Sequence, residues 1–284
     1  MTSVAITECP RDAMQSWPNF IPTDKKLRYL KQLLSCGFSR LDALSFVNPK
    51  AIPQFADADI IADKLGNEGV TTPLIAIVGN LKGAERARPF PHITHLGFPY
   101  SISPTFLQKN IHSTADEAIR RLVDIQEEAE AHHKKVLIYL SMAFGNPYQD
   151  AWSVSLIVDA VGKLVDLGFD EINLSDTIGI ATAEVLTASF KELGKAYPGV
   201  QFGAHLHVRP TNLNENIKAA WEGGCRIFDS AILGFGGCPV TADQQTGNVP
   251  TEKLLEFISG QGEGTSISEA EFHASVNLAQ DIFS

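Results

Sequence analysis

Two histidines two positions apart, His205 and His207, are the strongest chemical signal in this sequence. On an extended chain, residues i and i+2 point to the same face, so both imidazoles can bind one ion. Asp12 near an early apolar run and Asn248 in a later segment add a carboxylate and an amide oxygen. This nitrogen and oxygen set favours Mg²⁺ or Mn²⁺, with Zn²⁺ as a further option. The competing interpretation is two core histidines satisfied by hydrogen bonds.

Other reactive side chains also follow apolar runs. Arg11 precedes Asp12, Asp42 and Asp176 stand at the ends of later runs, and Cys238 follows a segment that holds three glycines. Taken singly, each carboxylate is more often a cap or a salt-bridge partner, and a lone cysteine is more often inert. Their shared position, at the ends of apolar runs, predicts that they meet at one edge of a sheet.

The elements that must position these residues alternate regularly. Apolar, β-branched runs predict strands over residues 4–9, 40–44, 74–78, 93–97, 136–141, 171–174, 200–205 and 226–231. Helical periodicity predicts helices over 23–35, 114–132 and 182–197, with Thr23, Thr114 and Thr182 as N-caps, and over 213–222 and 268–282. Eight such units predict an α/β fold, a single-domain TIM (β/α)8 barrel over residues 1–284, with 260–284 as a connector and a helix packed outside. An open doubly wound sheet is the alternative. No GxGxxG opens a helix after a strand, which disfavours dinucleotide binding.

Composition excludes several classes of function. The chain has 284 residues, 44% of them hydrophobic, and a formal net charge of −10, which disfavours nucleic-acid binding. Four scattered cysteines without a CxxC pair are typical of free thiols in a reducing compartment. Neither a signal peptide nor a membrane span is predicted, so we expect a cytoplasmic protein.

Several motifs resemble the HMG-CoA lyase family along nearly the whole barrel. They are Pro10-Arg11-Asp12, Ser45-Phe46-Val47-Asn48-Pro49-Lys50 with Pro53-Gln54, Asn80-Leu81-Lys82-Gly83, Ser175-Asp176-Thr177-Ile178-Gly179, Gly234-Phe235-Gly236-Gly237-Cys238-Pro239 and Gly247-Asn248. The glycine loop that ends in Cys-Pro is similar to the lyases and differs from the related synthases.

The resemblance implies a metal-dependent retro-Claisen cleavage of 3-hydroxy-3-methylglutaryl-CoA to acetyl-CoA and acetoacetate. A metal on Asp12, His205, His207 and Asn248 would lower the pKa of the substrate hydroxyl, and Arg11 would stabilise the thioester enolate. Asp42 and Asp176 would handle protons and support the metal ligands. Cys238 would protonate the enolate carbon, with His205 as the other candidate donor.

The implied partners are an acyl-CoA substrate and further copies of the chain, without nucleic acid or membrane. Expected substrate contacts come from Ser45, Asn80, Lys82 and Arg209. A set of basic residues past the second and third strands would attract the CoA phosphates, although each is equally compatible with a solvated basic edge: Lys50, Lys82, Arg86 and Arg88.

Some positions depart from the family pattern. Ala13 replaces a glycine, Asp42 a glutamate and Asn173 a serine, and Ser16-Trp17-Pro18 and Val208-Arg209-Pro210 replace other motifs. A guanidinium at 209 could bind the acyl carboxylate, or it could be an exposed loop arginine. Two alternatives follow: a related Claisen-type lyase or condensing enzyme for another acyl-CoA, or an inactive metal-binding barrel.

Overall fold

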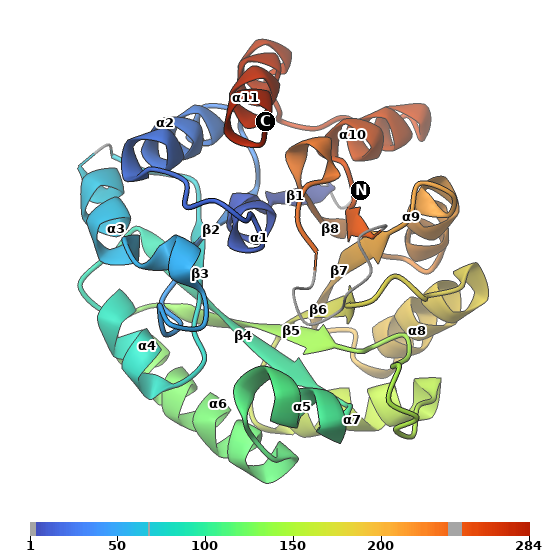
Figure 1. Ribbon diagram of the computed structural model, residues 1–284. Helices are drawn as coiled ribbons and strands as arrows, with labels where there is room; N and C mark the ends of the chain where they lie inside the picture. Colours follow the sequence, from blue (N-terminus) through green and yellow to red (C-terminus); the bar gives the residue numbers. More distant parts are fainter. Residues whose placement is uncertain (1–3, 68, 238–245) are drawn as a thin grey trace.

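A closed barrel of parallel strands forms the centre of the computed structural model, which describes residues 4–67, 69–237 and 246–284 (Figure 1). Neighbouring strands in the sequence pair with one another, and β1 also pairs with β8, which closes the sheet. The predicted TIM barrel is confirmed, and the open sheet is wrong. Each predicted strand is present within a few residues: β1 (Ala5–Glu8), β2 (Arg40–Ser45), β3 (Leu74–Ile77), β4 (Ile93–Ser101), β5 (Lys135–Ser141), β6 (Glu171–Asp176), β7 (Gln201–Val208) and β8 (Ile227–Ser230).

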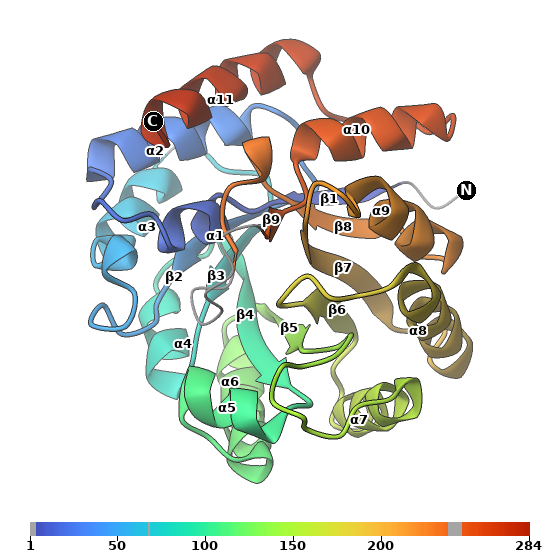
Figure 2. The ribbon, with the colours of Figure 1, turned by 45° about the vertical axis from the view of Figure 1, so that its right-hand side comes forward.

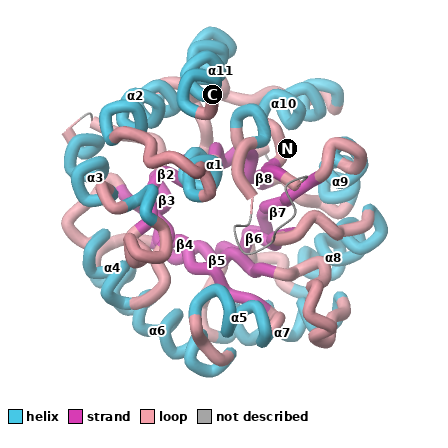
Figure 3. The backbone as a smooth tube through the Cα atoms, viewed as in Figure 1, coloured by secondary structure: helices cyan, strands magenta, loops and turns pink. Residues whose placement is uncertain are grey.

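Helices surround this barrel on its outer face (Figure 3). They are α2 (Thr23–Leu34), α3 (Ala58–Gly66), α4 (Leu81–Ala87), α5 (Pro104–Ile111), α6 (Ala115–Ala131), α7 (Val154–Asp166), α8 (Ala183–Ala196), α9 (Leu213–Glu222), α10 (Thr251–Gly260) and α11 (Glu269–Ile282), with short 3-10 turns η1 (Pro53–Phe55) and η2 (Ile232–Gly234). The last helix lies beside α2, outside the barrel (Figure 2). None of these helices, in the described part of the chain, has the length and apolarity to cross a membrane.

Side-chain caps explain where two of the predicted helices begin. Thr114 and Glu117 form a reciprocal capping box at the start of α6, and Thr182 caps α8. The predicted cap at Thr23 is wrong. Pro22 occupies the N-cap position of α2, and the Thr23 hydroxyl instead donates to Asp57, 2.7 Å away.

Two short elements at the mouth of the barrel were not predicted. A six-residue helix, α1 (Pro10–Gln15), follows β1 directly, so Arg11 and Asp12 stand on a helix instead of a strand end. Pro10 suits the first turn of α1 because that turn leaves its backbone N–H groups unpaired. Near the other end of the chain, β9 (Gly247–Asn248) pairs antiparallel with β7 and sets Asn248 opposite His207.

Alternation along the strands separates two environments. On β7, Ala204, Leu206 and Val208 pack in the large core between barrel and helices, whereas His205 and His207 lie on the opposite, inner face. A small separate apolar cluster comes from β3 and β5 and does not belong to that core: Ile75, Ile77, Leu137 and Tyr139. The polar inner face of β7 therefore lies inside the barrel, among buried groups of the neighbouring strands.

Candidate active site

Arg11 is the centre of a buried charge network at the mouth of the barrel. Its Nε lies 3.1 Å from both carboxylate oxygens of Asp42, and its Nη2 donates to Asp42 Oδ2 over 2.6 Å. The other terminal nitrogen donates to Asp12 (3.1 Å) and to Gln15 (2.7 Å), one turn along α1. Arg11 thus joins the carboxylate of α1 to the carboxylate of β2.

Burial and charge act in opposition in this network. Burial raises the pKa of Asp42 above its usual range although Arg11 opposes the shift. Burial also favours a raised pKa for Asp12, but Arg11 and His207 outweigh it and hold this pKa below the usual range. Burial disfavours the Arg11 cation, yet Asp42 and Asp12 raise the pKa of Arg11, so its guanidinium stays charged. Asp12 is therefore the ionised carboxylate and Asp42 the more basic one.

Both histidines of β7 have one ring nitrogen fixed by an acceptor. His207 Nδ1 lies 2.9 Å from the carbonyl oxygen of Thr177, and because a carbonyl only accepts, this nitrogen carries the proton. His205 Nδ1 lies 3.0 Å from Asp229 Oδ2. Burial lowers the pKa of His205, but the hydrogen bond and charge of Asp229 outweigh it and raise the pKa overall. Each ring therefore keeps its Nε2 for another partner.

Asn248 completes the predicted group. Its Nδ2 donates to Asp12 Oδ2 over 2.7 Å and to the carbonyl oxygen of Phe235 over 2.8 Å. The antiparallel pairing of β9 with β7 brings this amide beside His207. Four residues from three distant segments of the chain thus meet at one point of the barrel.

The residues present suit a divalent cation. One ligand atom each from Asp12, His205 and His207 lies within 4.8 Å of the others, and all three side chains are buried. His207 Nε2 is buried without a hydrogen-bond partner among the described residues, and the nearest carboxylate oxygen, of Asp12, is 3.7 Å away. An unpaired buried imidazole nitrogen is costly unless it meets a cation. This nitrogen is the observation that favours a metal over the alternative of two satisfied core histidines.

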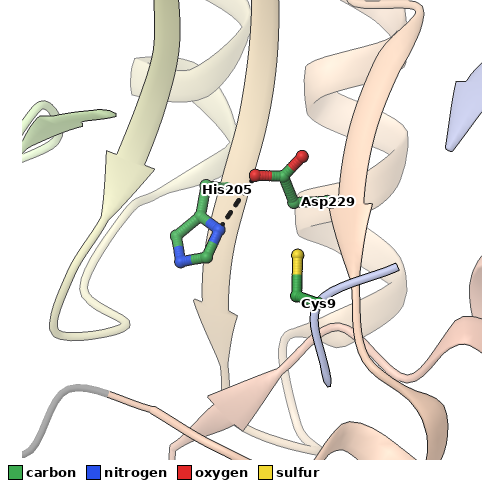
Figure 4. Close-up of side chains that lie close together, drawn as sticks. All are labelled: Cys9, His205 and Asp229. Carbon is green, nitrogen blue, oxygen red and sulfur yellow. Dashed lines mark hydrogen bonds and ion pairs between the residues drawn. The ribbon is translucent and has the colours of Figure 1, made fainter. Parts of the chain in front are cut away.

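A second group, Cys9, His205 and Asp229, shares His205 with the first (Figure 4). Its candidate ligand atoms also lie within 4.8 Å of one another. The Cys9 thiol donates toward the carbonyl oxygen of Thr7 (3.6 Å), and burial, with the nearby carboxylates, raises the pKa of Cys9 well above its usual value. Cys9 is thus a protonated thiol that lies beside His205 and Asp229. Asp229 holds the ring of His205 through the hydrogen bond to Nδ1.

The remaining predicted residues lie at the same end of the barrel but do different things. Both oxygens of the buried Asp176 accept backbone N–H groups, from Ile180 (3.1 Å) and Ala181 (2.9 Å). Burial raises the pKa of Asp176 although these hydrogen bonds oppose it. Asp176 therefore holds the turn after β6, whose Thr177 carbonyl fixes His207.

Among the predicted substrate contacts, only Ser45 is buried. Its hydroxyl accepts the N–H of Val47, 3.4 Å away. Asn80 is exposed and caps α4 by accepting the N–H of Gly83. Lys82 on α4 and Arg209 after β7 are exposed.

Two of the predicted CoA-attracting cations are already paired. Arg86 pairs with Asp59, and Arg88 pairs with Glu128 at 2.6 Å. Lys50, like Lys82, is exposed. Cys238 lies outside the described residues.

Sequence reasoning missed three members of the site. Asp229 is the acceptor for His205, Gln15 bridges Arg11 and Asp12, and the Tyr139 ring lies 5.4 Å from the His205 ring. Asp229-Ser230 at the end of the eighth apolar run was a usable signal, because polar residues at such ends mark the site elsewhere. Gln15 and Tyr139 carried no comparable signal.

Comparison with known proteins gives a consistent result. The HMGL-like family model matches residues 4–281. Hydroxymethylglutaryl-CoA lyases resemble the chain over 91% of its length: the mitochondrial enzyme of Arabidopsis thaliana is 32% identical, with 54% of that protein covered, and that of Mus musculus is 30% identical, with 79% covered. A Pseudomonas aeruginosa enzyme named 3-hydroxy-3-isohexenylglutaryl-CoA/hydroxy-methylglutaryl-CoA lyase is 31% identical over 96% of the chain and 89% of its own length.

Solved structures agree with these sequence relatives. The Bacillus subtilis HMG-CoA lyase superposes with a TM-score of 0.90 at 26% identity, covering 99% of this chain and 94% of that one. An HMG-CoA lyase from Acinetobacter baumannii, solved with coenzyme A and 3-methylmalate, superposes with a TM-score of 0.86 at 30% identity, covering 99% and 91%.

Proposed function

This chain belongs to the HMGL-like family and is a carbon–carbon lyase, and we propose that its substrate is 3-hydroxy-3-methylglutaryl-CoA. Cleavage between C2 and C3 would give acetyl-CoA and acetoacetate. The observation that carries the proposal is the buried Nε2 of His207, which lies beside the Asp12 carboxylate and has no hydrogen-bond partner in the described part of the chain. It supports a cation at the point where a hydroxyl and a carboxylate of this substrate would be bound.

The family depends on a divalent metal, and we assign the ligands here to Asp12, His205, His207 and Asn248. When bound, the ion would polarise the C3 hydroxyl and the terminal carboxylate and so lower the pKa of the hydroxyl. Mg²⁺ or Mn²⁺ suits this nitrogen and oxygen set, and Zn²⁺ belongs in the test beside them.

Arg11 is proposed to hold the thioester oxygen. A guanidinium has five N–H donors, and Asp42, Asp12 and Gln15 take four of those of Arg11 through the hydrogen bonds described above. One Nη2 N–H is left for an oxygen of the substrate. A fixed donor in a dry site favours the enolate over the neutral thioester because negative charge develops on that oxygen.

The protons need an acceptor and a donor. The hydroxyl proton would pass to Asp42 or Asp176, the two carboxylates of this end whose pKa burial raises; Arg11 meets the oxygens of Asp42, and backbone amides meet those of Asp176. C3 becomes the ketone of acetoacetate, and the C2–C3 electron pair becomes the enolate. That carbon then takes a proton and gives acetyl-CoA. Cys238 is the proposed donor; His205 would be a donor only if its Nε2 did not bind the metal, because its Nδ1–H is directed to Asp229.

Binding of the rest of the substrate is assigned to the buried Ser45 and to exposed residues at the mouth. Ser45, Asn80 and Arg209 would contact the acyl part, and Lys50 and Lys82 are better placed than Arg86 and Arg88 to attract the CoA phosphates because the two arginines already have acidic partners. Assembly into a homo-oligomer and a location in the cytoplasm stay predictions, the latter compatible with Cys9, Cys36 and Cys225 as free, buried thiols.

The decisive test is release of acetoacetate from 3-hydroxy-3-methylglutaryl-CoA after chelation and re-addition of Mg²⁺, Mn²⁺ or Zn²⁺. Activity should vanish on chelation and return with the ion. His207→Ala should lower metal affinity sharply, whereas His112→Ala, exposed at the end of α5, should not. Full activity after exhaustive chelation contradicts the proposal. Faster cleavage of 3-hydroxy-3-isohexenylglutaryl-CoA than of 3-hydroxy-3-methylglutaryl-CoA would show that the substrate is a different acyl-CoA.

A further inference from the structure

Among the described residues, two donors hold Asp229 in place. His205 Nδ1 lies 3.0 Å from its Oδ2, and Asn173 Nδ2 donates to the same oxygen over 2.9 Å. The other carboxylate oxygen, Oδ1, is buried without a hydrogen-bond partner among the described residues. The orientation of this carboxylate, and hence of the acceptor that fixes His205, therefore depends on Asn173.

The Asn173 side chain reaches Asp229 across an intervening strand. Asn173 on β6 is in register with Gly203 on β7, and His205, two residues on, is in register with Asp229 on β8. A Cβ atom at Gly203 would lie 2.1 Å from Asn173 Oδ1 and 2.8 Å from its Cγ. The φ of Gly203 lies outside the left-handed region, so the backbone itself does not require glycine there. Glycine is needed at position 203 because the Asn173 amide occupies the space that a Cβ atom would fill.

We propose that Asn173, admitted by Gly203, is a positioning residue that fixes the tautomer and ring orientation of His205 through Asp229. With Nδ1–H directed to Asp229, the basic nitrogen of His205 is Nε2. A metal-bound histidine typically needs such an acceptor for its other nitrogen, and loss of that support lowers metal affinity about 10- to 100-fold. The inference rests on the metal site proposed above, and it adds the two residues that set the geometry of one ligand.

The test measures Mn²⁺ affinity and the His205 tautomer in the full-length protein. Free Mn²⁺ is counted by electron paramagnetic resonance during titration, and imidazole ¹⁵N shifts report which ring nitrogen carries the proton. Asn173→Ala should weaken Mn²⁺ binding about 10- to 100-fold and mix the His205 tautomers. Gly203→Ala should act in the same direction because its Cβ displaces the amide.

The double variant separates positioning from packing. Gly203→Ala with Asn173→Ala removes the clash, so Tm should recover relative to Gly203→Ala alone while Mn²⁺ affinity stays low. Recovery of both would show that the pair only fills space and would overturn the proposal. As a control for general loss of stability, Thr187→Val removes a hydrogen bond to Ala219 on the outer helices and should leave Mn²⁺ affinity and the tautomer unchanged.

Failure of the metal site and failure of the positioning role give different results. If the wild-type protein binds no Mn²⁺, both proposals fall. If the wild type binds Mn²⁺ and Asn173→Ala binds it equally well with an unchanged tautomer, only the positioning role is lost.

Discussion

The two ends of the barrel each carry a buried cluster of charged side chains, but the balance of cations and carboxylates is opposite in the two clusters. At the end where the strands begin, Glu171 meets Lys135 at 2.8 Å, Arg40 at 2.7 Å and His95 at 3.5 Å. These side chains start or nearly start β6, β5, β2 and β4, so the cluster ties four strands together. Cations outnumber the carboxylate, and the arrangement favours stability.

The opposite end, where the strands finish, has the reverse balance. Arg11 joins Asp12 and Asp42, one Arg11 N–H is left over, and His207 Nε2 has no hydrogen-bond partner among the described residues. Burial of charge therefore does not by itself mark a functional site in this fold. The convergence of several candidate ligand atoms on one buried nitrogen without a hydrogen-bond partner in the described ranges marks it, because that nitrogen is costly in the free protein and is satisfied when a cation binds.

The largest expected effect is on catalysis at the Arg11 end. Arg11→Met should lower kcat and kcat/KM together by about 10²–10³-fold, as expected for loss of a donor that acts on developing charge. Its counterpart at the other end, Arg40→Met, should lower Tm while kcat per folded molecule stays near the wild-type value. Steady-state kinetics on protein whose folded fraction is checked by circular dichroism distinguishes the two. An Arg11 variant within a few-fold of wild type would make Arg11 a structural residue.

The next effect concerns the shorter carboxylate at position 42. The family pattern has a glutamate at this position, which is one methylene longer than aspartate. In this structure the Arg11 guanidinium donates directly to the shorter Asp42 carboxylate. Asp42→Glu should push Arg11 out of place, and a misplacement of about 1 Å can cost on the order of 10²-fold in kcat. Kinetics at saturating metal measure this loss, with Asp42→Asn as the variant that keeps the size and removes the base. Wild-type rates in Asp42→Glu would show that the network tolerates either length.

Much of this arrangement was predictable because it depends on local pattern. Apolar runs and N-caps located the strands and α6 and α8, and the two-residue spacing of His205 and His207 located the inner face of β7. The missed features depend on contacts between distant strands. Asn173 reaches Asp229 only because the register of three strands places Gly203 between them, and β9 exists only because it pairs with β7. No spacing within one segment contains that information.

At the opposite end, the expected effect is on stability and depends on pH. Burial opposes ionisation of Glu171, but His95, Lys135 and Arg40 lower the pKa of Glu171 to about 2. A folded pKa below the unfolded value of 4.5 means that this group stabilises the fold fully above pH 4.5, and that the stabilisation is lost as pH falls toward 2. Glu171→Gln should therefore lower the free energy of unfolding by about 2 kcal/mol at pH 7, roughly 30-fold in the unfolding constant.

Urea denaturation at a series of pH values measures this difference. The gap between wild type and Glu171→Gln should narrow between pH 4.5 and 2, and activity per folded molecule at pH 7 should not change. A gap that is constant with pH would mean that Glu171 contributes by packing and not by its charge.

The smallest expected effect is on substrate binding by Arg209, an exposed residue at the catalytic end of the barrel. Arg209 is exposed two residues past His207, where the chain leaves β7. If its guanidinium binds the acyl carboxylate, Arg209→Ala should raise KM for 3-hydroxy-3-methylglutaryl-CoA up to about five-fold, because an exposed ion pair contributes at most about 1 kcal/mol. The inhibition constant of an acyl-CoA that lacks the carboxylate should change less. Lys218→Ala, exposed on α9 and paired with Glu222, is the matched loss of charge away from the mouth and should change neither constant. Equal weakening of both acyl-CoA compounds by Arg209→Ala would assign Arg209 to general attraction of the CoA phosphates, and no change in either would leave it outside the site.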